Sequence, residues 1–289
     1  MKDYLKLVRP EQYVKNFFVF APLFFGGAFL DTSLLLQVIW AMVAFSLAAS
    51  SIYIINDFLD INEDRSHPIK SKRPLASGKI TVGKAIVLQV TLMLAAMSLS
   101  FWLSIELFVI ICIYIVMNIL YSKWLKHIAI LDINIIAIGF VLRLLAGTAV
   151  TGIQPSIWIL LITYLLALFL GIAKRRTDVI LAQGGMEVRK NIEGYNLGFI
   201  DTVLGVLASI VIVSYIFYCI APENQKHYNS DLLYVSIIFV VNGIFRYLKL
   251  ALVDQSTYSP TLIVLKDRFI QVTIVCWILL MSYLLYCNR

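Results

Sequence analysis

Residues 56–80 read NDFLDINEDRSHPIKSKRPLASGKI and place four acidic side chains within eight residues, directly before a run of lysines and arginines. The apolar stretch 34–58 leads into this segment and is long enough to cross a lipid bilayer as a helix. If the helix continues, Asp57, Asp60 and Asp64 fall on one face, because successive residues turn by about 100°. Converging carboxylates beside cations predict a site for a charged ligand.

A divalent cation is the expected partner of these acids. Three carboxylates at a helix C-terminus repel one another and meet the partial negative charge of the helix end. Mg²⁺ relieves both costs, and it is commonly held by one or two carboxylates together with phosphate oxygens. The alternative is a solvated, acid-rich helix end. The stiff basic loop 67–74, which contains Lys70 and Arg73, favours a ligand site over that alternative.

The composition is that of a polytopic membrane protein. Of the 289 residues, 61% are hydrophobic and only 14% are charged, which excludes an ordinary soluble domain. The four cysteines have neither metal-ligand nor disulfide spacing. The net charge of +7 is distributed between the apolar segments, which favours anionic headgroups or a phosphorylated substrate over nucleic acid.

Apolar runs of about 17 to 25 residues predict nine transmembrane helices, so we expect an all-α protein with a single domain over 1–289. The expected helices cover 14–30, 34–58, 81–103, 106–121, 132–151, 155–173, 200–220, 232–252 and 267–287. Of the 24 lysines and arginines, all but Arg143, Lys226 and Arg289 then lie on the side of the N-terminus. The positive-inside rule makes this side cytoplasmic. We therefore expect a multi-pass protein of the cell (inner) membrane, with a cytoplasmic N-terminus, an external C-terminus and an active-site cavity that faces the cytoplasm.

The second long inner connection, 174–199, follows the expected sixth helix and carries Lys174, Arg175, Asp178 and Tyr195. Basic loops at a membrane surface are often only topology signals. An acid four residues after a lysine has no topological purpose, however. We therefore expect Asp178 to supply a second carboxylate that faces the first acidic cluster.

Arg143 lies within the expected fifth helix, where an ionised side chain costs several kcal/mol unless it is paired or solvated. A functional role is the default expectation for such a residue, and a structural pair with a buried acid is the alternative. Other polar candidates lie on the inner side of the expected membrane domain. They are Arg9, Lys15, Asn16, Tyr121 and Lys123.

The pattern NDxxDxxxD over 56–64 resembles the first aspartate motif of the UbiA superfamily of intramembrane prenyltransferases, and nine helices fit that family. Its members hold a diphosphate through Mg²⁺ on the aspartates. The resemblance therefore implies a metal site made by Asn56, Asp57, Asp60 and Asp64. The usual second motif is DxxxD, whereas here Asp178 is followed four residues later by Ala182.

Further segments resemble a narrower branch of the superfamily. They are RPxQxxKN over 9–16, HPxKxxRPxAxG over 67–78, YSxxLKH over 121–127, GFxLRxxAG over 139–147, and KRR followed by an acid over 174–178. The resemblance implies transfer of 5-phosphoribose from phosphoribosyl diphosphate to a polyprenyl phosphate, with release of diphosphate, in cell-envelope biogenesis. The implied catalytic residues are Asp57, Asp60, Asp64 and Asp178. The implied ligands of substrate phosphates are Arg9, Lys15, Asn16, Lys70, Arg73, Tyr121, Lys123, Arg143, Lys174, Arg175 and Tyr195.

Two alternatives remain open at this point. Transfer of a prenyl chain from its diphosphate to an aromatic or other small acceptor would be favoured by a complete second DxxxD, which 178–182 lacks. A transporter would need a polar path across the bilayer, whereas the charged clusters stay on the inner side and only Arg143 lies deeper. The expected partners are the two substrates and the lipid bilayer, with homo-oligomer formation left open.

Overall fold

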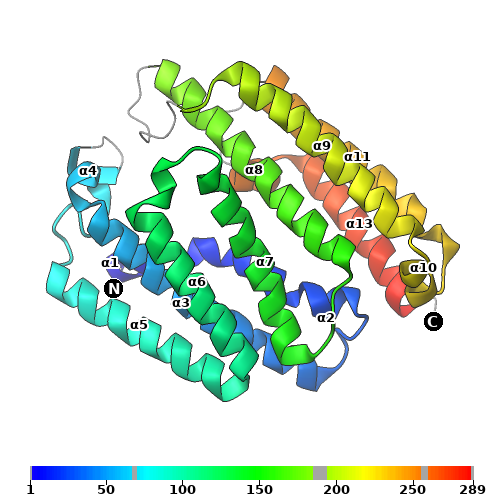
Figure 1. Cartoon of the computed structure of the whole chain (residues 1–289), viewed down its shortest axis with the longest axis horizontal. Helices are drawn as coiled ribbons and strands as arrows, with labels where there is room; N and C mark the ends of the chain where they lie inside the picture. The colour runs from blue at the N-terminus through cyan, green and yellow to red at the C-terminus, as the bar shows by residue number, and fades with distance from the viewer. Residues whose placement is uncertain (1, 67–69, 185–193, 255–259, 288–289) are drawn as a thin grey trace. The chain divides into compact units, whose positions relative to one another are not determined.

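The computed structural model of the chain describes residues 2–66, 70–184, 194–254 and 260–287. Within these residues all regular elements are helices (Figure 1), so the all-α expectation is confirmed. By length and composition, eight of the described helical segments can cross a membrane. They are α3 Thr32–Leu59, α5 Val82–Leu103, α6 Ile105–Lys123, α7 Leu131–Thr151, α8 Ile157–Gln183, α9 Leu197–Ile220, Asp231–Val253 around α11, and α13 Arg268–Tyr286.

The first expected helix, 14–30, is not one continuous helix in the structure. The chain begins with α1 Lys2–Val8, continues as the 3₁₀ helix η1 Pro10–Phe20 and then forms the short helix α2 Ala21–Phe25. Pro10 and Pro22 stand at the start of η1 and α2, where a proline ring favours a new helical segment over a continuous helix. A count of apolar residues does not detect these breaks.

Residues Met1–Pro155 form the first of two compact units. Helix α3 packs against η1, α5, α6 and α7 within it (Figure 1). Small side chains on α3, such as Ala44, Ala48 and Ser51, are fully buried and let neighbouring helices approach closely. Gly147 on α7 has the same function, because a Cβ there would lie 2.0 Å from the carbonyl oxygen of Val19 on η1. Three short helices complete the unit: α4 Ile61–Ser66, η2 Lys70–Lys72 and η3 Leu125–His127.

Residues Ser156–Arg289 form the second unit, in which α8 pairs with α9, and α11 Ile237–Leu248 packs on α9 and α13. Shorter helices connect these spans: α10 Pro222–Tyr228, η5 Asp231–Ser236, the π-helical segment η6 Lys249–Val253 and α12 Pro260–Lys266. The buried hydroxyls of Tyr218 and Tyr228 share a hydrogen bond, and Trp277 Nε1 donates to the Tyr215 oxygen over 2.7 Å. These bonds tie α9 to α10 and α13.

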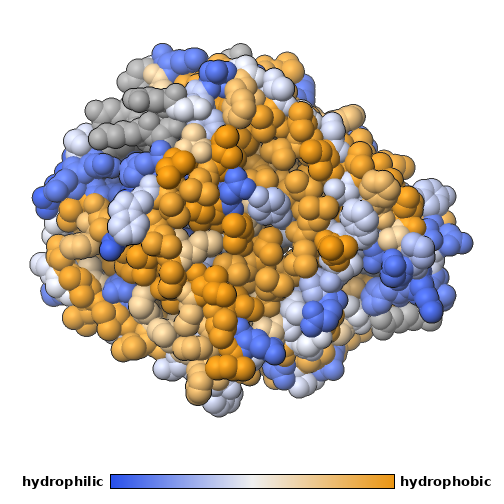
Figure 2. All heavy atoms as spheres, in the orientation of Figure 1, coloured by the Kyte–Doolittle hydropathy of each residue, from blue (hydrophilic) through white to orange (hydrophobic). Residues whose placement is uncertain are grey.

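The outer surfaces of the helices are apolar. On the face shown in Figure 2, hydrophobic side chains cover most of the helical surface. Large side chains such as Trp102 and Val87 are 75% and 67% exposed, which is unfavourable in water and favourable against lipid. The chain is therefore a multi-pass membrane protein.

Candidate active site

The acidic side chains converge at the C-terminal end of α3. Helix α3 ends at Leu59, and Asp60 adopts a non-helical backbone before α4 begins, so the three aspartates do not share one continuous helix. Asp57 and Asp64 nevertheless come together, because Arg73 Nη1 donates to Asp57 Oδ1 over 3.0 Å and to Asp64 Oδ2 over 2.7 Å. Both aspartates are almost completely buried.

Asp57 receives a second arginine from the N-terminal segment. Arg9 Nη2 donates to the same oxygen, Asp57 Oδ1, and the Arg9 guanidinium also lies 5.3 Å from the centre of the Tyr53 ring. Arg9 has a left-handed backbone with φ 57° and ψ 58°, a conformation that costs a non-glycine residue of the order of 1–3 kcal/mol and that gathers at functional sites. Asp57 Oδ2, by contrast, is buried and accepts no hydrogen bond from any described residue.

Asp60 pairs with Lys126, a residue that our sequence-based site did not include. Lys126 lies in η3, directly after α6, while Lys123 is exposed and lies 5.6 Å from the centre of the Trp124 ring. The signal was present in the sequence, because Lys126 is the fixed lysine of YSxxLKH and Lys123 is one of its variable positions. We refer to Asp57, Asp60, Asp64, Arg9, Arg73 and Lys126 as the shared-charge cluster.

Arg143 is buried within α7 of the same unit. Its Nε donates to Asn16 Oδ1 over 2.8 Å and its Nη1 to the Gly139 carbonyl over 2.7 Å, while Asn16 in turn donates to Ser46. The guanidinium also lies 4.9 to 5.5 Å from the ring centres of Phe45, Tyr114 and Phe140. No carboxylate among the described residues pairs with Arg143, so the alternative of a buried acid partner is wrong for this part of the chain. Neutral oxygens and aromatic faces hold this cation and leave its charge uncompensated.

The remaining candidates of the first unit lie around these two sites. Asn56, Lys15, Lys70 and Tyr121 are half-buried. Asn56 accepts the N–H of Asp60 through its backbone carbonyl oxygen, and the metal role of its side chain stays a prediction. His67 and Pro68, which open the motif over 67–78, lie outside the described residues.

The candidates of the second unit lie on α8 and just before α9. The buried Arg175 donates to Asp178 Oδ2 over 2.8 Å, one turn further along α8. Lys174 is exposed on the same helix, and Tyr195 is buried near Phe199. The third member of the KRR triplet, Arg176, binds Asp201 on α9 and the carbonyl of Ala251 in η6. That Asp178 faces the first acidic cluster stays a prediction.

The shared-charge cluster lacks the expected set of converging carboxylates but still offers one oxygen that could bind a magnesium ion. The described residues contain no group of three or more His, Cys, Asp or Glu side chains arranged to hold a metal ion, and Arg73 instead bridges Asp57 and Asp64. Mg²⁺, however, needs only one or two protein carboxylates when phosphate oxygens and water complete its shell. Asp57 Oδ2, buried and without a hydrogen-bond donor, is a suitable first ligand. The residues present therefore fit Mg²⁺ bound together with a phosphate-bearing substrate.

The family of the chain is indicated by sequence comparison. The model of the UbiA prenyltransferase family matches residues 17–259. The decaprenyl-phosphate phosphoribosyltransferase of Mycolicibacterium smegmatis is 33% identical over 285 residues, which cover 95% of this chain and 89% of that protein. The enzyme of the same name from Corynebacterium glutamicum is 32% identical over 280 residues, which cover 95% of this chain and 84% of that protein.

Comparison with solved structures supports the fold. A UbiA homologue from Archaeoglobus fulgidus, solved with DMAPP and Mg²⁺, superimposes with a TM-score of 0.74 and covers 99% of this chain and 100% of its own. The two sequences are only 17% identical, so this likeness concerns the arrangement of the helices alone.

Proposed function

The chain belongs to the UbiA prenyltransferase family and is a transferase, and we propose that it moves 5-phosphoribose from phosphoribosyl diphosphate to a polyprenyl phosphate, with Mg²⁺ and with release of diphosphate. Relatives named for this phosphoribosyl transfer match 95% of the chain at about one-third identity. The observation from the structure that carries the proposal is the number of buried or half-buried cations in one unit. Arg9, Arg73 and Lys126 bind the aspartates, and Arg143 is buried within α7 without a carboxylate partner among the described residues.

This number of cations suits the proposed substrates. Transfer of a prenyl chain to a neutral acceptor involves one anionic group, the diphosphate. Phosphoribosyl transfer involves three: the diphosphate, the 5-phosphate of the ribose and the phosphate of the lipid. Arginine binds phosphate through two parallel N–H bonds, and such charge-assisted bonds are roughly twice as strong as neutral ones. Arg9 and Arg73 would exchange their bonds to Asp57 for bonds to substrate phosphates.

The proposed step needs no general base. The bond between ribose C1 and a diphosphate oxygen breaks with its electron pair leaving on the diphosphate, and an oxygen of the lipid phosphate forms the new bond to C1. Mg²⁺, when bound, neutralises the leaving diphosphate. Asp57, Asp60 and Asp64 would position the magnesium diphosphate, while the nearby cations stabilise charge that develops on the phosphates. The attacking phosphate is already anionic, so no proton has to be removed.

The direct test uses purified protein, Mg²⁺, a polyprenyl phosphate and phosphoribosyl diphosphate labelled in the ribose. We expect the label to enter the organic phase together with stoichiometric diphosphate release, and to stay in water after chelation of Mg²⁺. A parallel reaction supplies a prenyl diphosphate and an aromatic acceptor. Prenylation of that acceptor, with no ribose label in the lipid, would replace the proposal with the alternative transfer.

We also propose that the acidic end of α3 faces the cytoplasm, the side on which a water-soluble sugar diphosphate is supplied. The support is the concentration of lysine and arginine on the expected inner side. With eight continuous spans among the described residues, this orientation also requires η1 and α2 together to cross the membrane as a ninth, broken span, and reporter fusions at the two ends of the chain should then report opposite compartments. The same compartment for both would contradict this orientation. Assembly into a homo-oligomer stays a prediction.

A further inference from the structure

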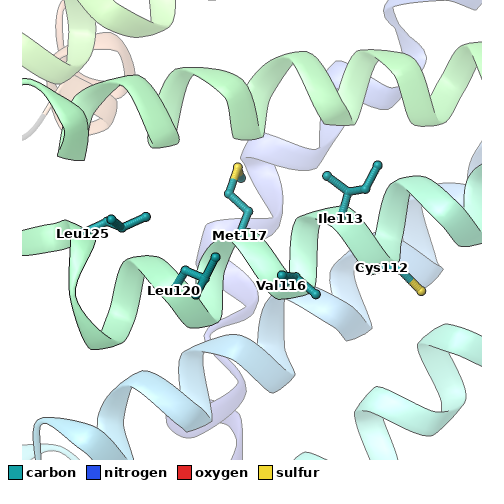
Figure 3. Close-up of a pocket in the computed structure, with 6 residues that line it drawn as sticks. All are labelled: Cys112, Ile113, Val116, Met117, Leu120 and Leu125. Carbon is teal, nitrogen blue, oxygen red and sulfur yellow. The ribbon is translucent and has the colours of Figure 1, made fainter.

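Helix α6 carries an apolar hollow of about 410 Å³ on one of its sides (Figure 3). The lining residues are Cys112, Ile113, Val116, Met117, Leu120 and Leu125. Apart from the Cys112 thiol, these side chains have no polar group other than a thioether. The five that belong to α6 are spaced by one, three and four residues and lie on one side of the helix, while Leu125 follows in η3. The α6 part of the hollow, from Cys112 to Leu120, spans roughly 12 Å along the helix axis.

The hollow is a shallow depression that lies wide open along one side of α6. Its volume lies within the range of roughly 300 to 1,000 Å³ that is typical of ligand sites in proteins. Val116 and Ile113 in its lining are 56% and 49% exposed, so the hollow is open to the hydrocarbon region. An apolar chain could therefore enter it sideways from the membrane without crossing a polar layer.

One end of the hollow meets the shared-charge cluster. Leu125 is the last lining residue, and the next residue, Lys126, binds Asp60. Lys123 is exposed one turn earlier, at the end of α6. Basic residues at the end of an apolar surface attract anionic headgroups. The hollow and its basic end together match an amphiphile with a long apolar chain and a phosphate head.

Met117, one of the lining residues, lies near the residues that bind Arg143. The methyl carbon of Met117 lies 3.9 Å from the position of a Cβ on Gly139, whose carbonyl oxygen accepts Arg143 Nη1. Tyr114, which lies on α6 three residues before Met117, accepts Arg143 Nη2 through its hydroxyl over 3.3 Å. Methionine side chains adapt readily to irregular apolar partners. Met117 therefore contacts both the hollow and the part of α7 whose Gly139 carbonyl binds Arg143.

We infer that this hollow binds the isoprenoid chain of the polyprenyl phosphate acceptor and directs its phosphate toward Lys126. This inference rests on the proposed function, since it names the position of one of the two substrates. It makes the α6 side of the first unit the determinant of acceptor chain length. A phosphate with one or two isoprene units would not reach along the hollow from its basic end, whereas a longer chain would fill it.

Filling the hollow tests the inference kinetically. Val116→Trp places a large ring in it, and Val109→Trp is the matched control, because Val109 is a similarly exposed valine of α6 outside the lining. We expect Val116→Trp to raise the KM for a long polyprenyl phosphate about tenfold or more, with an unchanged KM for phosphoribosyl diphosphate and for a one-unit prenyl phosphate. Equal effects of the two tryptophans, or equal effects on long and short acceptors, would overturn the inference.

Photo-crosslinking keeps the inference separate from the proposed function, because it needs no turnover. Wild-type protein is irradiated with a polyprenyl phosphate that carries a diazirine on its isoprenoid chain, and the modified peptide is identified by mass spectrometry. We expect labelling within 112–125 that survives an excess of phosphatidic acid. Labelling confined to other segments, no labelling, or displacement by phosphatidic acid would overturn the inference. Absence of ribose transfer in the presence of this labelling would instead count against the proposed reaction alone.

Discussion

Acidic and basic side chains are arranged differently in the two units. In the first unit, two arginines share Asp57 Oδ1, and Arg73 is in turn shared between Asp57 and Asp64. Among the described residues of the second unit, the ion pairs each join one carboxylate to one cation, as in the pairs Arg246–Asp267 and Lys249–Asp254. A carboxylate and a cation that pair one to one satisfy each other without a ligand. Shared charges leave bonding capacity for a ligand that brings both positive and negative groups.

The surroundings of Asp57 and Asp267 make this difference concrete. Asp57 is buried and one of its oxygens lacks a donor, an arrangement that costs free energy unless a further partner binds. Asp267 accepts from both Nε and Nη2 of Arg246 and also from the backbone N–H of Ile270 at the start of α13. The structural role of Asp267 is therefore complete without a ligand, whereas that of Asp57 is not.

The largest expected effect follows from removing the charge of Asp57. Asp57→Asn keeps the size of the side chain but loses the carboxylate, so we expect kcat/KM to fall by about 10²–10³-fold or more. Asp267→Asn is the control and should leave kcat/KM near the wild-type value. Steady-state kinetics on well-folded protein provides the measurement. Near-normal activity of Asp57→Asn would remove the metal role of the shared-charge cluster.

Arg73→Ala should have the next largest effect. Loss of one charge-assisted phosphate contact costs about 1.5 to 3 kcal/mol, or roughly a tenfold to hundredfold loss in kcat/KM. Lys174→Ala and Arg175→Ala belong to the same series, with Arg246→Ala as the control. If one of these cations binds the 5-phosphate, its substitution should lower kcat/KM much less with a donor that lacks the 5-phosphate. Equal losses with both donors for all three variants would assign them to the diphosphate and favour prenyl transfer.

Lys126→Ala tests the lysine that the structure adds to the site, and a smaller effect is expected. Lys126 binds a single carboxylate at the edge of the shared-charge cluster, so its loss should cost about 1 to 1.5 kcal/mol, or roughly fivefold to tenfold in kcat/KM. Lys123→Ala is the comparison variant: Lys123 is exposed and lies against the Trp124 ring, so its loss should cost less than the loss of Lys126. A larger loss for Lys123→Ala would reverse this assignment.

The smallest expected effect concerns stability. Hydrogen bonds from Arg246 lower the pKa of Asp267 below its ordinary value. A carboxyl whose folded pKa is lowered stabilises the fold above the unfolded value of about 4, and this contribution is lost as the pH falls through the folded pKa. Asp267→Asn should therefore lower Tm slightly at neutral pH, and the Tm of this variant should fall less in acid than that of the wild type. Thermal unfolding of both proteins in detergent across this range measures the difference, and parallel curves with a constant gap would contradict it.

The helices could be predicted from sequence because long apolar runs have one stable form in lipid, which holds for the eight later spans. The prediction of one continuous helix over 14–30 was wrong, because prolines divide a stretch that is apolar enough to span the membrane. The meeting of Asp57 and Asp64 was foreseen from helical spacing, although the helix ends between them and Arg73 joins them instead. The partners of Arg143 could not be foreseen, since Asn16 lies 127 positions away in the sequence.

Equilibrium binding of phosphoribosyl diphosphate, with and without Mg²⁺, tests most directly whether the shared-charge cluster of the first unit is the site of phosphoryl-group recognition. The wild-type protein and Asp267→Asn should bind this donor more tightly with Mg²⁺ than without it. Asp57→Asn should lose the enhancement by Mg²⁺, because the buried oxygen that completes the metal site is gone. Binding that does not depend on Mg²⁺ in any of the three proteins, or enhancement that persists in Asp57→Asn, would contradict the account.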